Sequence, residues 1–458
     1  MSDVATGPRR TPLRGIVAWV LFDPAAQPFF TLVTTFVFAP YFAARVAANP
    51  VEGQALWGLA TGAAGLIIAV FSPVLGAIAD AAGRRKPWIA AFSVLLVVGS
   101  AALWFTPPGV AGSVGIALAA FAIGTIGVEF ATVFTNAMMP ELVEESRLGR
   151  LSGIGWAVGY VGGLVSLVIT LGLLAAQPET GRTFFGLAPI LGLDPATNAG
   201  DRATGPLSAI WYIVLVLPLF LFTPDSPRRL GLATAVRVGL GDLKTTLTSL
   251  GRHANAARYL AANMAYTDGL IALFAFGGIY AAGTFGWGAT ELGLFGILLT
   301  ITGTIGALSG GWLDDRLGPK RVIAATLIVL ILASLAILSI DRDHLGFVFS
   351  VAPPAPGDGL FATAGEKAYL GLGALIGAAA GPLQAASRTL MARVAPRDRM
   401  TQFFGLYALT GKATSFVAPL LVAFVTHQSG SQRAGVSVLV VFFAVGFWLM
   451  RRVNEGRG

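Results

Sequence analysis

The sequence predicts an all-α membrane protein with twelve transmembrane helices in two pseudo-symmetric six-helix bundles, and three observations support this prediction. The 458 residues are 55% hydrophobic and only 12% charged, with a mean hydropathy of +0.74. About a quarter of the residues in an ordinary soluble domain are charged. Twelve apolar runs are long enough to cross a bilayer, which needs about 20 helical residues. The two halves of the chain also share sequence patterns.

The apolar runs divide into two sets of six. A polar, basic stretch at 224–256 separates them, and Pro-, Gly- and Asp-rich connections occupy 177–206 and 341–368. We therefore expect an N-terminal bundle at 1–223, a cytoplasmic linker at 224–256 and a C-terminal bundle at 257–458. The basic N-terminus precedes a run longer than the roughly 7–15 residues of a signal-peptide core, so we expect a retained first helix. The predicted spans are 15–44, 55–81, 87–106, 112–138, 151–176, 207–223, 257–284, 290–313, 322–340, 369–392, 403–427 and 434–450.

The basic residues are distributed unevenly between the two sides of these spans. The side with both termini carries 23 of the 31 Lys and Arg residues, the opposite loops carry 6, and two lie inside spans. Lys and Arg accumulate in cytoplasmic loops. We therefore expect both termini in the cytoplasm and, because the Ala-, Gly- and Arg-rich composition is typical of a GC-rich bacterial gene, an inner-membrane location. The net charge of +8 then needs no nucleic-acid partner.

Two loop patterns repeat between the halves. GAIADAAGRRK after the second span matches GWLDDRLGPKR after the eighth at a shift of 235 residues, and MPELVEESRLGRLSG after the fourth matches MARVAPRDRMTQFFG after the tenth at a shift of 252. Glycines permit close helix approach and tight turns, and the Asp residues can cap a helix N-terminus or accept hydrogen bonds from Arg. We expect cytoplasmic gating loops formed by Gly76, Asp80, Gly83, Arg84, Arg85, Lys86, Asp315, Arg316, Gly318, Lys320 and Arg321.

The paired loops resemble the signature loop of the major facilitator superfamily. Four longer stretches resemble the vacuolar amino-acid effluxers linked to autophagy and their bacterial relatives. The resemblance implies the major facilitator fold, in which spans one, four, seven and ten line a central cavity. The sequence departs from the family at Pro24, where an aromatic residue is expected, and at Ala26, where Asn is common. The four stretches are LFDPAAQPFFTLVTTFVFAPYF, MMPELVEESRLGRLSGIGWAVGYVGG, GGIYAAGTFGWGATELGLFGILLTITGTIGALSGGWLDDRLGPKR and GPLQAASRTLMARVAPRDRMTQFFGLYALTGKATSFVAPLL.

Five ionisable residues stand out inside predicted spans, where a charge costs about 2.5–3.5 kcal/mol at the bilayer centre. Four of them fall on the spans that the resemblance assigns to the cavity: Asp23, Glu129, Asp268 and Arg388. The fifth, Lys412, lies in span eleven. Polar neighbours at helical spacing extend the pattern. The predicted substrate or proton cavity comprises Asp23, Gln27, Glu129, Asn136, Asn263, Asp268, Gln384, Arg388 and Lys412.

Each charge also has an alternative interpretation. Asp23 either faces the cavity or lies near the cytoplasmic edge beside Arg10 or Arg14. Glu129 either faces the cavity or forms a buried pair with a basic residue. Arg388 either anchors a substrate carboxylate or pairs with Glu129 or Asp268. Lys412 is predicted to be a structural pair partner.

These features favour a secondary transporter of small zwitterions such as amino acids, working by alternating access with proton or other ion coupling. A broad drug or sugar exporter and a lipid flippase are the alternatives. The sequence contains no cysteine and no GxxxxGK[ST] phosphate loop, and its three histidines have no metal-ligand spacing. We therefore expect no enzyme activity, no metal and no bound cofactor. The expected partners are a small-molecule substrate and the lipid bilayer, with the chain acting as a monomer.

Overall fold

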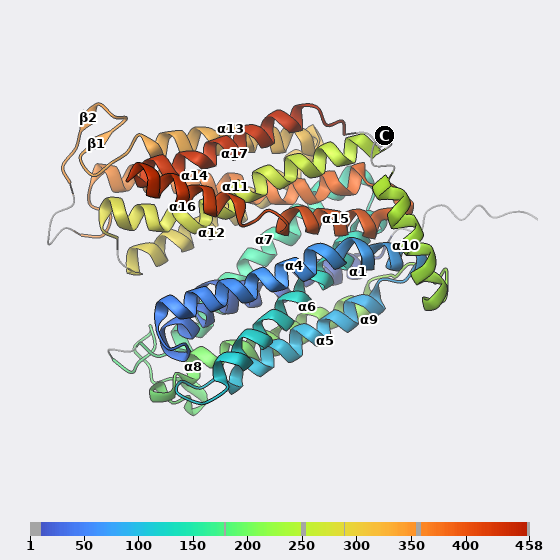
Figure 1. Ribbon diagram of the computed structural model, residues 1–458, viewed down its shortest axis with the longest axis horizontal. Helices are drawn as coiled ribbons and strands as arrows, with labels where there is room; N and C mark the ends of the chain where they lie inside the picture. The colour runs from blue at the N-terminus through green and yellow to red at the C-terminus, as the bar shows by residue number, and fades with distance from the viewer. Residues whose placement is uncertain (1–10, 178–179, 249–252, 288, 354–358, 456–458) are drawn as a thin grey trace, which may run out of the picture.

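The computed structural model is almost entirely helical, and it describes residues 11–177, 180–248, 253–287, 289–353 and 359–455 (Figure 1). The predicted connections 177–206 and 341–368 and the linker 224–256 each contain a few residues outside these ranges. Twelve helical spans are long and apolar enough to cross a membrane, which confirms the predicted number. Several begin earlier than predicted. The sixth, for example, covers Ala199–Phe222, because a short helix, Ala199–Arg202, precedes its main helix.

The helices form two groups, and the α10 helix lies at the end of the molecule near both described termini (Figure 1). The first group contains α1 (Leu13–Val20), α2 (Phe22–Pro28), α3 (Phe38–Tyr41), α4 (Pro50–Ala82), α5 (Lys86–Ala102), α6 (Ser113–Leu142), α7 (Leu148–Ile169), α8 (Ala199–Arg202) and α9 (Thr204–Phe222). The linker helix α10 covers Leu232–Thr248. The second group contains α11 (Ala254–Phe285), α12 (Ala289–Leu317), α13 (Pro319–Leu338), α14 (Ala364–Val394), α15 (Met400–Lys412), α16 (Val417–Ser429) and α17 (Gln432–Arg451).

The first span is irregular after Pro24 and Pro28. After Pro28 the chain changes from α-helical to π-helical geometry over Phe29–Phe36, and a second π-helical segment covers Phe42–Val46. Pro28 has no N–H, so the carbonyl of Pro24 lacks its usual helical donor. The indole Nε1 of Trp211 on α9 donates to this carbonyl at 2.9 Å. This bond holds the Asp23–Pro24 turn against the sixth span.

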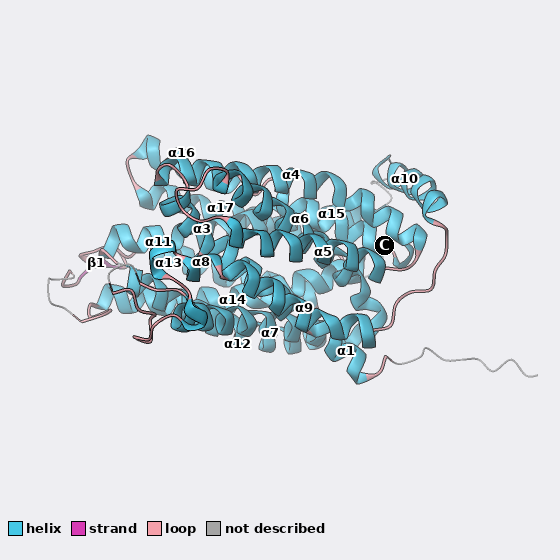
Figure 2. Ribbon diagram, turned by 90° about the horizontal axis from the view of Figure 1, so that it is seen from below, coloured by secondary structure: helices cyan, strands magenta, loops and turns pink. Residues whose placement is uncertain are grey.

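Helices of the two groups contact closely at the α10 end, which we call the closed end, and diverge toward the opposite end (Figure 1). Seen from below, the long helices of both groups run in the same general direction, away from the closed end (Figure 2). Glycines permit these contacts. A Cβ on Gly153 of α7 would lie 2.8 Å from the Cα of Gly311 on α12, and a Cβ on Gly76 of α4 would lie 2.9 Å from the Cα of Gln402 on α15. Side chains at these glycines would separate the groups.

The opposite end carries a small antiparallel hairpin of β1 (His344–Leu345) and β2 (Phe349–Ser350). Arg433 at the start of α17 donates to Asp341 at 3.0 Å and so attaches this loop to the bundle. Burial acts to raise the pKa of Asp341, but hydrogen bonds from the Asp343 N–H, Arg433 and the His344 N–H outweigh it and leave the pKa below its usual value.

Candidate functional site

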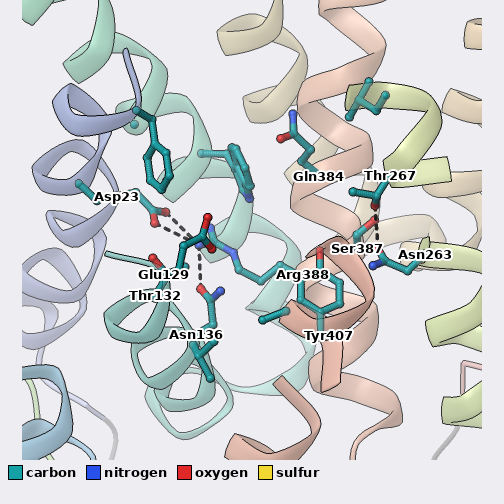
Figure 3. Close-up of a pocket in the computed structure, with 18 of the residues that line it drawn as sticks. Asp23, Glu129, Thr132, Asn136, Asn263, Thr267, Gln384, Ser387, Arg388 and Tyr407 are labelled. Atoms are coloured by element: carbon teal, nitrogen blue, oxygen red, sulfur yellow. Dashed lines mark hydrogen bonds and ion pairs between the residues drawn. The ribbon is translucent and has the colours of Figure 1, made fainter. Parts of the chain in front are cut away.

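A cavity of about 490 Å³ lies between the two groups of helices, a volume that is typical of small-molecule sites. Side chains from α2, α6, α7, α11, α14 and α15 line it (Figure 3). The structure places eight of the nine predicted cavity residues in this lining: Asp23, Gln27, Glu129, Asn136, Asn263, Gln384, Arg388 and Lys412.

Arg388 and Asp23 form an ion pair across the two groups of helices. Nη1 of Arg388 donates to the two carboxylate oxygens of Asp23 at 3.0 and 3.3 Å. Nη1 also donates to Asn136, and Nε and Nη2 donate to the hydroxyl and carbonyl oxygens of Ser152 at 2.9 and 2.7 Å. The side chain of Arg388 is only 4% exposed, so it depends on these partners for compensation of its charge.

The ion pair between Asp23 and Arg388 distinguishes between the alternative interpretations given above for each of these two residues. Asp23 lines the cavity and pairs with Arg388, whereas the guanidinium of Arg14 lies 5.9 Å from the ring of Phe222. Arg10 lies outside the described residues. The predicted pairing of Arg388 with Glu129 or Asp268 is wrong, because the carboxylate nearest its guanidinium comes from the first span.

A second cross-group ion pair joins Lys412 of α15 to Glu129 of α6, with an Nζ–Oε1 distance of 2.6 Å. Both side chains line the cavity and both are partly exposed within it. Both alternative interpretations of Glu129 are therefore correct, since its side chain faces the cavity and also has a basic partner. The predicted pairing role of Lys412 is confirmed. The first group thus supplies two acids to the cavity and the second group supplies two bases.

Asp268 does not belong to the cavity lining, which corrects the prediction. It is only 2% exposed, and its neighbouring polar side chain is Thr414, which follows the end of α15. The geometry of α11 explains the difference. Five residues separate Asn263 from Asp268, and at about 100° per residue the two side chains are roughly 140° apart around the helix. Asn263 faces the cavity and donates to Thr410 at 3.1 Å, so Asp268 points elsewhere.

Sequence reasoning missed the contribution of the fifth span. Ser152 binds Arg388, Trp156 lines the cavity, and the hydroxyl of Tyr160 accepts a hydrogen bond from Gln384 at 2.7 Å. These three residues are spaced four apart, which is a signal of a common helix face. Glycines alternate with these residues along the fifth span and permit close helix packing. They do provide it, since Gly155 lies directly beneath the Asp23–Arg388 pair.

At the closed end, Asp80 of α4 caps a helix of the other group. Its two carboxylate oxygens accept hydrogen bonds from the backbone N–H groups of Thr401 and Gln402, at 3.0 and 2.8 Å, in the first turn of α15. Arg85 lies 3.7 Å from Asp80, and it also binds Glu141 and Thr401. The predicted capping role is confirmed, and the capped helix belongs to the opposite group.

Asp315 makes the reciprocal contact. It lies at the end of α12 and accepts hydrogen bonds from the backbone N–H and Nε of Arg150, at 3.2 and 2.9 Å, in the first turn of α7. Each loop therefore caps a helix of the opposite group, and we call these two contacts the paired caps. A carboxylate in this position also interacts favourably with the helix dipole.

The other predicted gating residues support the turns around these caps. Gly83 and Gly318 have φ values of +90° and +88°, which favour glycine. Lys86 donates to the carbonyl of Phe220, and Lys320 donates to that of Arg451. The guanidinium of Arg316 lies 3.6 Å from the centre of the Trp312 ring, while Arg84 and Arg321 are exposed.

Residues 48–458 match the family described as vacuole effluxer Atg22 like. The chain belongs to the Atg22-like family. A relative of this Atg22-like chain, the uncharacterized major-facilitator-type transporter YxiO of Bacillus subtilis, is 22% identical over 96% of the chain and 94% of its own length. Autophagy-related protein 22-1 of Penicillium rubens is 27% identical over 69% of the chain, which spans about half the length of that fungal relative.

Solved structures show that the Atg22-like chain has the major facilitator fold. The human organic anion transporter MFSD10 aligns with a TM-score of 0.68 at 16% identity, over 96% of this chain and all of that protein. The proton:xylose symporter XylE also aligns with a TM-score of 0.68, at 14% identity, over 96% of this chain and 95% of its own. The family match and the similarity to YxiO over nearly the whole chain, together with this fold, identify the Atg22-like chain as a multi-pass transporter of the major facilitator superfamily, and not an enzyme.

Proposed function

We propose that this protein is a secondary active transporter of small zwitterions, with amino acids as the leading substrate class. The observation that supports this proposal is the arrangement of charges in the cavity. Two acids of the first group pair with two bases of the second group inside one chamber. A zwitterion carries one charge of each sign, so it can satisfy a base and an acid when a cross-group pair separates.

In this proposal, three of the charges bind the substrate. The substrate carboxylate would bind Arg388, whose planar guanidinium suits bidentate recognition, and the ammonium would bind Asp23 or Glu129. Apolar and aromatic side chains, including Phe30, Leu270 and Phe274, line the rest of the cavity and would contact the uncharged part of the substrate. Rocking of the two groups about this site would give alternating access.

Proton coupling in this proposal acts through Glu129. A proton on this carboxylate would cancel its attraction to Lys412, so the proton and the substrate would both weaken the contacts between the groups. The excess of basic residues on the terminal side supports cytoplasmic termini. We further propose a bacterial inner-membrane location and action as a monomer.

Replacing Glu129 by Gln tests the coupling. We expect Glu129→Gln to abolish amino-acid flux driven by a pH gradient in proteoliposomes while counterflow exchange continues, because the amide cannot carry the proton. Radiolabelled amino-acid flux with and without a pH step measures both activities. Glu52→Gln, at an exposed carboxylate outside the cavity, is the matched control. Persistence of gradient-driven flux in Glu129→Gln would show that this carboxylate is not the proton carrier.

Gly155 tests the importance of the Asp23–Arg388 pair without removing either charge. A Cβ at Gly155 would overlap Oδ2 of Asp23 and lie 2.7 Å from Nη2 of Arg388, so Gly155→Ala is expected to displace the pair and to reduce flux by about tenfold, which corresponds to about 1.4 kcal/mol. At Gly159 a Cβ would lie 3.5 Å from Asp23 Cβ, an ordinary contact. Gly159→Ala is therefore the control, and equal flux in the two variants would contradict the prediction.

A further inference from the structure

The eleventh span is interrupted beside Asp268. Helix α15 ends at Lys412 and α16 begins at Val417, so the two form separate helical segments (Figure 1). Within the described residues, the backbone N–H groups of Thr414 and Ser415 make no helical hydrogen bond to the preceding turn. The carbonyl oxygens of Thr410 and Gly411 therefore lack their usual helical donors, whereas the carbonyl of Lys412 accepts a hydrogen bond from the Ser415 hydroxyl at 3.1 Å. Inside a membrane, a carbonyl without its helical donor requires another partner.

Asp268, in the same region, is an acidic residue without a basic partner among the described residues. Asp23 and Glu129 have basic partners at 3.0 and 2.6 Å, whereas the described residues provide no basic side chain within ion-pair distance of Asp268. The carboxylate is 98% buried, and its Oδ1 accepts no hydrogen bond from any described residue. Its polar neighbour is the hydroxyl of Thr414, within the interruption. An isolated charge inside a membrane protein needs a compensating partner.

We propose that Asp268 and the interruption between α15 and α16 form a binding site for a monovalent cation, with Na⁺ as the ion. The oxygen donors would be the Asp268 carboxylate, the Thr414 hydroxyl and the carbonyls at the end of α15. Interrupted membrane helices bind Na⁺ in this manner, through unwound carbonyls and helix C-terminal ends. The described residues bring no group of three His, Asp or Glu together, and oxygen donors with one carboxylate suit Na⁺ better than a transition metal.

The position of the site suggests how an ion there would act on the cavity. Lys412 is the last residue of α15 before the interruption, and its ammonium pairs with Glu129 of the other group. Asn263 of α11 donates to Thr410 one turn earlier, so α11 and α15 are joined on the cavity side of the interruption. Binding of Na⁺ would order the segment that carries Lys412 and so stabilise this cross-group contact. This inference rests on the proposed function only in assigning the ion a role in transport.

Thermal unfolding of the purified full-length chain tests the site without requiring transport. The unfolding temperature is measured in NaCl, KCl and choline chloride at equal ionic strength and fixed pH, and then across a pH series without Na⁺. We expect NaCl to raise the unfolding temperature of the wild type in a saturable manner, because an ion that binds only the folded state stabilises it. We expect Asp268→Asn to abolish the response.

Thr414→Val provides a second variant in case Asp268→Asn does not fold, and it is expected to raise the half-saturating Na⁺ concentration by about tenfold. Glu52→Gln, at an exposed carboxylate outside the cavity, should keep the response. The proposal is overturned if the wild type does not respond to Na⁺, if Asp268→Asn responds like the wild type, or if lowering the pH reproduces the stabilisation and Na⁺ adds nothing. A Na⁺ response that needs Asp268 in a protein without amino-acid flux would support the site and contradict the proposed function. Amino-acid flux in a protein without a Na⁺ response would support the proposed function and contradict the Na⁺ site.

Discussion

Replacing Arg388 by Gln is expected to abolish transport and to destabilise the protein. The substitution removes five hydrogen bonds to Asp23, Asn136 and Ser152 and leaves the Asp23 carboxylate without its basic partner. Removing one member of a buried ion pair costs about 3–5 kcal/mol. Because Asp23 is 19% exposed, we expect the lower end of this range. Unfolding temperature and amino-acid flux in proteoliposomes measure the two effects.

A double variant separates the structural role of Arg388 from its proposed role in binding. Asp23→Asn combined with Arg388→Gln removes both charges, so no unpaired charge remains and much of the stability should return. Transport should remain absent, since the guanidinium that binds the substrate carboxylate is missing. Wild-type flux in the double variant would show that the pair only holds the helices together.

Removing the charges of the paired caps is expected to open the closed end. Asp80→Asn and Asp315→Asn each weaken hydrogen bonds to the first turn of a helix in the opposite group. An Asn side chain keeps one acceptor oxygen but loses the second acceptor and the negative charge, and such a charge at a helix N-terminus contributes about 0.3–1 kcal/mol, or up to about 2 kcal/mol where it is partly buried. A difference of about 1.4 kcal/mol corresponds to a tenfold change in an equilibrium. We therefore expect the double variant to raise the population that is open at this end by about tenfold or more.

Thiol labelling can measure this change, because the native chain contains no cysteine. Ala385 is 1% exposed, and its carbonyl accepts a hydrogen bond from Ser152 across the two groups. In an Ala385→Cys background, a maleimide should react faster when both caps are neutralised. Asp343→Asn, at the opposite end, should leave the rate unchanged. An equal labelling rate in all three proteins would show that the caps do not hold this end closed.

The fold could be predicted from the sequence because its signals are local. Each span is a continuous apolar run, and bilayer thickness alone sets its length. The loops repeat with glycines and aspartates at matching positions, so a capping role for Asp80 and Asp315 was also predictable. The sequence did not show that each cap reaches a helix of the other group, since that depends on how the two groups dock.

Most of the residues that line the cavity could be predicted, because charged side chains inside membrane spans need a shared polar environment. The pairing was not, because Asp23 and Arg388 lie 365 positions apart and meet only after both groups assemble. Asp268 was placed wrongly because its span was considered as a whole, whereas the helical angle from Asn263 turns it away from the cavity. The helix α10 within the linker was also not predicted. Its Gly239 packs against the backbone of Ala77 and Ile78, a contact for which the polar composition gives no signal.

The reciprocity of the paired caps has a consequence for how the protein could be divided. Asp80 stabilises the start of α15, and Asp315 stabilises the start of α7, so neither half alone contains a complete capping unit. Each half expressed by itself would expose one helix N-terminus with free N–H groups and one aspartate without the helix N-terminus that it caps. Complementation of two separately produced fragments would therefore restore both contacts together, as in the assembly of an obligate dimer from two similar subunits.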